Sequence, residues 1–254
     1  MNRFRQIFEN LNWIKRSVKN APIPSTPPSP EDKKRWEEES AKQIEKFSSN
    51  LRELSTELAK RGWYANMDMP LKFFNALRPL LKTNKLKSID GMMAAYFQHH
   101  LEPVENEIMS AFPSRAQILS AAFRAHTQKT YTLSVPVFLI QADGICSELL
   151  GVGVYSRTKG VPQTAFAIEQ FKDDELMSSL LEPLRIAGAL NAYADEKHQY
   201  PDIFNRHEIL HGKSLNYATE LNSFRAISLL SYLCSTVSGA FFFKEASKDP
   251  QKYI

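Results

Sequence analysis

Glycine, cysteine and long apolar runs are all scarce in this chain. Nine glycines in 254 residues are about half the usual share, and abundant Leu, Ala, Lys and Glu favour helices. Cys146 and Cys234 stand in apolar stretches, so we interpret them as buried thiols rather than a disulfide or a metal pair. No run reaches the roughly 18 to 20 apolar residues of a membrane span, and the first residues lack a signal peptide's apolar region. We therefore expect an all-α, cytoplasmic protein without a transmembrane segment.

Most of the chain carries no net excess of positive or negative charge. The formal net charge is +4, and residues 1–20 account for all of it: Arg3, Arg5, Glu9, Lys15, Arg16 and Lys19. The remaining residues balance to zero. Binding to nucleic acid would therefore depend on a local basic patch rather than on overall charge.

The first 60 residues are predicted to form an N-terminal extension ahead of the rest of the chain. Apolar residues on one face and basic residues on the other predict a short amphipathic helix over 4–18. Five prolines make 20–30 a linker. Ser29 is a predicted N-cap followed by Pro30, so a long helix should begin there and cover 31–61. A protein partner could bind residues 1–60.

Apolar periodicity predicts further helices along the chain. We expect them at 71–82, from Ser88 or Asp90 onward with a break near Pro103, at 129–150, at 175–193 and at 214–240, with a surface loop at 151–175. The helix at 214–240 is apolar on a broad face, which indicates a central position. We divide the chain into 1–30 (helix and linker), 31–112 (helical extension) and 113–254 (helical domain).

Residues 204–214, FNRHEILHGKS, concentrate the side chains that can perform chemistry. His207, Glu208 and His211 match H-E-x-x-H, in which two histidines about 40° apart on a helix bind zinc and the glutamate activates a water. A glycine directly after His211 and the lack of a third ligand argue against this interpretation. Asn205 can instead cap the helix, with Glu208 as the second half of a capping box.

The same segment also contains Arg206 and His211 at a spacing that suits RNA cleavage without metal. A histidine can move the proton of the 2′-OH or of the leaving oxygen, and an arginine can hold the phosphate. On an ideal helix the two residues lie about 140° apart. They converge only if Arg206 leans across or if a second subunit completes the site.

Structural roles are an alternative for these residues. Arg206 could pair with Asp202 or Asp143, and His211 could be a core histidine. Asp143 could orient Arg206 or His211 from a facing helix, or cap a turn with Gly144. His126 and His198 are predicted at helix ends, where the helix dipole stabilises a histidine without any functional role.

Asn205-Arg206-His207 through His211-Gly212, followed by NYATELNSFRAISLL, resembles the C-terminal part of HEPN-domain proteins. More broadly, RGWYANMDMP, FPSRAQILSAAFRAH and YTLSVPVFLIQADGI resemble a group of bacterial proteins that carry such a segment. The resemblance implies an all-α bundle, a homodimer, and a ribonuclease without metal or cofactor that acts on RNA in toxin–antitoxin or anti-phage systems. By the same analogy Arg206 and His211 are catalytic and His207 is their polar neighbour.

We therefore predict an all-α helical bundle with an HEPN-like C-terminal domain and an N-terminal helical extension. Its predicted function is that of a metal-independent endoribonuclease that uses Arg206 and His211, supported by His207, Asn205, Glu208 and Asp143. A non-catalytic helical interaction or regulatory protein is the alternative. A zinc hydrolase with His207 and His211 as ligands is a lesser alternative.

Overall fold

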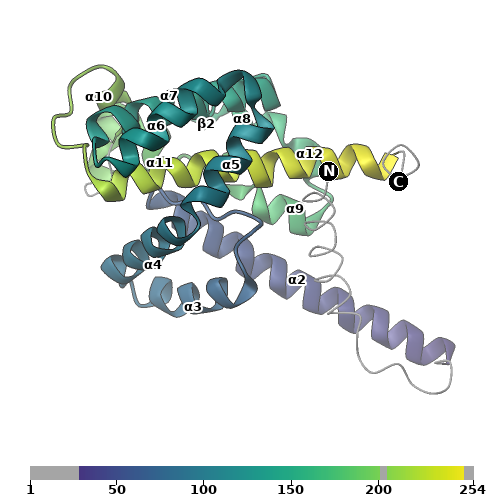
Figure 1. Cartoon of the computed structure of the whole chain (residues 1–254). Coiled ribbons are helices and arrows are strands. Elements are labelled where there is room, and N and C mark those ends of the chain that lie inside the picture. The colour runs from purple at the N-terminus through teal and green to yellow at the C-terminus, as the bar shows by residue number, and fades with distance from the viewer. Residues whose placement is uncertain (1–28, 201–204, 249–254) are drawn as a thin grey trace.

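The computed structural model describes residues 29–200 and 205–248. The helix predicted over 4–18 and nearly all of the predicted linker lie outside these residues. The described part of the chain is almost entirely helical (Figure 1), which confirms the predicted all-α class. Its α-helices are α2 (Pro30–Lys60), α3 (Leu71–Lys82), α4 (Leu86–His99), α5 (Leu101–Ala111), α6 (Ala116–Thr127), α7 (Tyr131–Leu150), α8 (Gln163–Ala167), α9 (Glu175–Leu180), α10 (Arg206–Leu210), α11 (Glu220–Tyr232) and α12 (Ser238–Lys248).

Shorter elements complete the described chain. Single turns of 3-10 helix lie at Pro113–Arg115, Glu169–Phe171, Glu182–Leu184 and Ala189–Asn191, and a longer one lies at Ala194–Gln199. The strands β1 (Arg157–Thr158) and β2 (Val161–Pro162) pair antiparallel, with Arg157 opposite Pro162.

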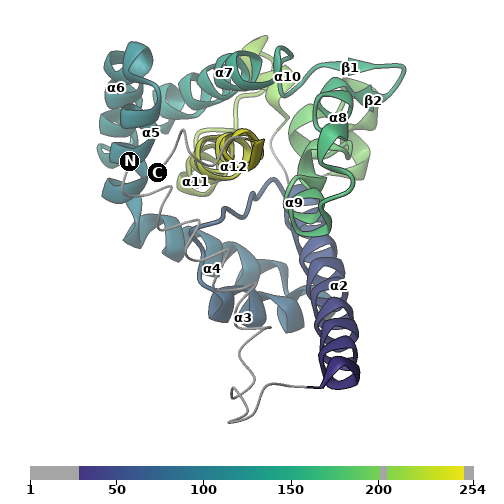
Figure 2. The same cartoon turned by 90° about the vertical axis from the view of Figure 1, so that its right-hand side faces the viewer.

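One long helix occupies the centre of the fold. A π-helical turn at Leu233–Val237 joins α11 to α12, and Figure 2, which looks along this helix, shows the other elements placed around it. Every residue from 222 to 237 is buried, as predicted for a central helix. The helix begins at Glu220 rather than at 214, because the Thr219 side chain caps it by accepting a hydrogen bond from the Asn222 N–H at 3.2 Å.

The segment after α2 lies along this central helix without forming a helix of its own. Its backbone needs polar partners, and hydroxyl groups of the central helix supply them. The Tyr64 N–H donates to Ser228 at 3.2 Å and the Met67 N–H donates to Thr236 at 3.2 Å. Serine and threonine on an otherwise apolar helix therefore anchor a buried irregular segment.

The predicted start of α2 is confirmed. Ser29 caps the helix by accepting from the Asp32 N–H at 3.1 Å, and Pro30 is the first helical residue. The N-terminal half of α2 extends beyond the other elements in both views (Figures 1 and 2). The C-terminal half packs on α9 and on the following turn Glu182–Leu184, in which Glu182 lies 3.7 Å from Arg52.

Three predicted elements differ from the structure. The helix expected from Ser88 or Asp90 begins at Leu86 and ends at His99, and Pro103 lies in the first turn of α5, where its missing N–H is tolerated. The range 151–175 is not a simple surface loop, because it forms β1, β2 and α8 and buries Tyr155, Ile168 and Phe171. The range 175–193 is broken into short helices.

A continuous apolar core crosses the boundary predicted between residues 112 and 113. It includes Leu58, Trp63 and Phe97 on one side and Phe138 and Ile227 on the other. Both cysteines are buried thiols, as predicted, and they do not form a disulfide. The core is therefore shared by the predicted extension and the predicted C-terminal domain.

Two helices of the described chain are long and apolar enough to cross a membrane, contrary to the expectation from the sequence. They are α7 and the continuous helix Glu220–Ala246. Of their most apolar stretches, 44% and 78% respectively are buried inside the protein. Core helices of soluble proteins share this length and composition, and the burial of the second helix fits such a role.

Candidate functional site

The helix that carries the candidate residues has only five residues. Asn205 caps α10 by accepting from the Glu208 N–H at 3.2 Å, as predicted. The helix ends at Leu210 with His211 as its C-cap, and Gly212 has a φ of +67°, a conformation that favours glycine. The N–H groups of Lys213 and Ser214 then fold back onto the Glu208 carbonyl at 2.7 and 3.1 Å. A helix this short differs from the longer helix on which H-E-x-x-H usually lies.

Arg206 leans against an aromatic ring from another segment. Its guanidinium carbon lies 4.3 Å from the centre of the Tyr155 ring, a cation–π contact. The Nε atom is buried, and among the described residues neither it nor the terminal nitrogens have a hydrogen-bond partner. The predicted ion pair of Arg206 with Asp143 does not form, and Asp202 lies outside the described residues. Arg206 is thus held by its flat face while its terminal nitrogens stay available.

Tyr155 is a rigid support for that contact. The side chain is buried, and its hydroxyl donates to the Leu139 carbonyl of α7 at 3.1 Å. Burial raises the pKa of Tyr155 well above its usual value, and the nearby Arg206 charge lowers it only in part. The ring therefore stays neutral. Sequence analysis missed Tyr155, because no spacing relates it to Arg206.

The two histidines of the segment lie together. The ring centres of His207 and His211 are 4.3 Å apart, and His211 is exposed. The pKa of His207 is lowered, first by desolvation and then by the positive charges of His211, Lys213 and Arg206, while Glu208 opposes the shift. His207 is therefore biased towards the neutral form, in which one ring nitrogen accepts a proton.

Asp143 supports the site in a way that the sequence did not predict. It lies in the middle of α7, so it does not cap a turn with Gly144, and its Oδ1 accepts from the Tyr155 N–H at 3.4 Å. A Cβ on Gly153 would lie 2.6 Å from this Oδ1, so a side chain at position 153 would displace the Asp143 carboxylate. Asp143 thus positions Tyr155, and through its ring Arg206.

A proline in α7 anchors the loop that follows α10. Pro136 lies inside the helix and has no N–H, which leaves the Thr132 carbonyl without its usual helical donor. The Tyr217 hydroxyl donates to that carbonyl at 3.0 Å. The chain after His211 is thereby fixed to the same helix on which α10 packs.

The described residues contain no group of three or more His, Cys, Asp or Glu side chains that could hold a metal ion. His207 and His211 would offer two ligands, and a structural zinc site needs four while a catalytic one needs three. The zinc alternative therefore lacks a ligand within this part of the chain.

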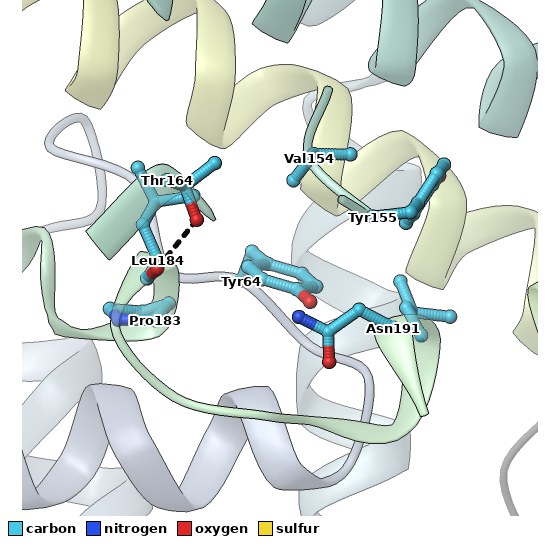
Figure 3. A pocket seen from close by; sticks show the side chains of 8 residues that line it. Tyr64, Val154, Tyr155, Thr164, Pro183, Leu184 and Asn191 are labelled. Atoms are coloured by element: carbon cyan, nitrogen blue, oxygen red, sulfur yellow. Dashed lines mark hydrogen bonds between the residues drawn. The ribbon is translucent and has the colours of Figure 1, made fainter. Parts of the chain in front are cut away.

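A small cavity lies beside Tyr155. Tyr64, Tyr155, Thr164, Leu184 and Asn191 are among the residues that line it (Figure 3), and its volume is about 10 Å³. This is room for about one water molecule. The cavity does not provide a preformed small-molecule site, so the candidate site is the open surface around Arg206, His207 and His211.

Comparison with known proteins does not identify a family for this chain. No protein-family model, curated protein or solved structure matches the chain.

Proposed function

We propose that this protein is a metal-independent endoribonuclease whose site is formed by Arg206, His207 and His211. The observation that supports it is that one short helical segment carries an arginine with unbonded terminal nitrogens and two histidines in ring contact, of which His211 is exposed. An arginine with free terminal nitrogens can bind a phosphodiester through two hydrogen bonds. The resemblance to HEPN-domain proteins points to the same residues.

The proposed chemistry uses only proton transfers and charge stabilisation. A neutral histidine takes the proton of the 2′-OH, and the resulting oxygen attacks the adjacent phosphorus. The bond from phosphorus to the 5′-oxygen breaks, and that oxygen receives a proton from a protonated histidine. The products end in a 2′,3′-cyclic phosphate and a 5′-OH. Arg206 stabilises the charge that develops on the non-bridging oxygens.

In this proposal His211 is the general acid or base, and His207 is the supporting residue. The lowered pKa of His207 suits a group that is neutral near pH 7. Within the described part of one chain, no direct contact joins Arg206 to His211. A homodimer could complete the site by placing the Arg206 of one copy near the His211 of another.

The direct test is cleavage of a mixed RNA pool by the purified protein in EDTA. We expect cleavage with cyclic phosphate ends, and its loss in both His211→Ala and Arg206→Ala. Lys129→Ala, a change at an exposed residue after α6, is the control and should cleave like the native chain. Cleavage that EDTA abolishes and zinc restores would favour a zinc hydrolase instead.

An interaction or regulatory protein is the second candidate. Large apolar side chains are exposed on α7, with Leu133 60% and Ile140 51% exposed, and Leu215 beyond α10 is 87% exposed. Such side chains are common at protein interfaces. RNA that stays intact with and without metal, together with a stable complex that Leu133→Asp disrupts, would support this candidate over the ribonuclease.

A further inference from the structure

Tyr193 is an exposed aromatic ring held in a fixed position beside α10. It precedes the helical turn Ala194–Gln199, and its side chain is 46% exposed. Its neighbour Ala192 accepts a hydrogen bond from the Asn205 side chain at 3.3 Å, and Asn205 is the cap of α10. Tyr193 is therefore tied to the segment that carries Arg206.

A buried arginine lies under the Tyr193 ring. The guanidinium carbon of Arg157 is 4.4 Å from the ring centre, and the Arg157 side chain is only 3% exposed. Tyr193 as a whole is 46% exposed, so about half of the residue remains open to solvent beside this contact. Arg157 covers one face of the ring, and the exposed part of Tyr193 is available to a ligand.

Arg157 has no donor left for a ligand. Its Nε and one terminal nitrogen donate to the Gly160 carbonyl at 3.1 and 2.8 Å. Its terminal nitrogens also donate to the Asn191 carbonyl at 3.3 Å and to both carboxylate oxygens of Glu196. These contacts use all five N–H groups of the guanidinium. Arg157 therefore acts as a fixed support for the ring and not as a phosphate clamp.

The two arginine–tyrosine contacts begin two residues apart in the chain, at Tyr155 and Arg157, and the buried partner is the tyrosine in one and the arginine in the other. Tyr155 is buried and supports Arg206, whose terminal nitrogens remain available. Arg157, two residues later, has a buried side chain and supports Tyr193, which remains about half exposed. One contact presents a cation and the other an aromatic surface. A nucleotide needs both, a cation for its phosphate and a flat surface for its base.

We propose that Tyr193 is a stacking platform for an unpaired base of single-stranded RNA, next to the phosphate that Arg206 holds. This inference rests on the proposed ribonuclease function, because that function makes RNA the ligand. Stacking on a ring face is tolerant of sequence, so Tyr193 favours single strands over duplexes without selecting one base. Residues 21–254 carry no net charge, so a non-ionic contact such as stacking contributes a larger share of the affinity for RNA.

The test is binding of a short single-stranded RNA that carries 2-aminopurine, whose fluorescence is quenched when it stacks. Binding is measured in the His211→Ala background, so that the RNA remains intact. Tyr193→Leu should weaken binding by about fivefold to a hundredfold and abolish the quenching, whereas Tyr193→Phe should retain both. The matched control is Phe166→Ala, which removes another exposed ring, 69% exposed, and should leave both unchanged.

Leucine at this position still shields Arg157 from water, so a purely structural role for Tyr193 predicts native binding in Tyr193→Leu. Native binding in Tyr193→Leu would overturn the proposal, and so would equal losses of RNA affinity in Tyr193→Leu and Phe166→Ala. Equal affinity for single-stranded and duplex RNA would also overturn it.

The ribonuclease proposal and the stacking proposal can fail separately. RNA cleavage that does not depend on Tyr193 refutes the platform alone, and quenching that depends on Tyr193 without any cleavage refutes the nuclease alone.

Discussion

His126 is a buried histidine whose protonation opposes folding. It lies in the last turn of α6, as predicted, and the residue is only 4% exposed. Its Nδ1 is 2.8 Å from the Ser223 hydroxyl, which is 2.9 Å from the Ser134 hydroxyl. Burial lowers the pKa of His126, and Glu220 opposes the shift in part.

We predict that this histidine makes the protein less stable in weak acid. The unfolded chain, with a histidine pKa of about 6.5, binds the proton more tightly than the folded chain. The stabilisation is therefore complete above about pH 6.5 and is lost as the pH falls towards the lowered pKa. Thermal unfolding across this range should show a smaller pH dependence in His126→Gln. The control, His99→Gln at an exposed position, should behave like the native chain, and equal slopes in all three proteins would contradict the prediction.

Asp90 balances a buried positive charge. It accepts from Trp63 Nε1 at 2.7 Å and from Arg225 at 3.1 Å, and the Arg225 side chain is 4% exposed. Asp90→Ala should lower the free energy of unfolding by about 3 kcal/mol, because it leaves the Arg225 charge poorly compensated. Urea denaturation measures this loss. Asp90→Asn keeps an acceptor for Trp63, so its free energy of unfolding should fall by less. Arg35→Ala breaks an exposed ion pair and serves as the control, because it should change this free energy by under about 1 kcal/mol. A loss in Asp90→Ala as small as in Arg35→Ala would refute the argument.

At the scale of elements, α7 and the loop after α10 depend on each other. The proline in α7 exposes the Thr132 carbonyl, and the Tyr217 hydroxyl is its donor. Tyr217→Phe removes only this hydroxyl and should cost about 1 kcal/mol of stability. Hydrogen exchange of residues 211–219 should become faster while that of the central helix stays unchanged. Tyr131→Phe, which removes a comparable exposed hydroxyl contact to Glu220, is the control, and exchange in 211–219 that matches the native chain would contradict the role of Tyr217.

At the scale of the whole molecule, the shared core predicts cooperative folding across the predicted domain boundary. Trp63 and Tyr64 are buried against the central helix, so a fragment of residues 113–254 would expose a large apolar surface. We expect this fragment to lack a cooperative urea transition, whereas the full chain unfolds in one transition. Circular dichroism follows both, because the fragment contains no tryptophan. A cooperative transition of the fragment would instead support an independent domain at 113–254.

The sequence by itself determined the features that depend on neighbouring residues. Helix content followed from composition, and the caps at Ser29 and Asn205 followed from side chains that bond to N–H groups three residues later. Such contacts lie within one turn of chain, so the local pattern contains the needed information. The predicted sites His207 and His211 also lie together because they are one helical turn apart.

Only the tertiary structure decided the contacts between distant segments. Arg206 lies on Tyr155 rather than on an acid, Asp143 bonds to the Tyr155 backbone, and the range 151–175 is partly buried. Each of these results depends on which segments the central helix brings together. Side chains far apart in the chain have no fixed spacing, so no sequence period relates Tyr155 to Arg206 or Arg157 to Tyr193.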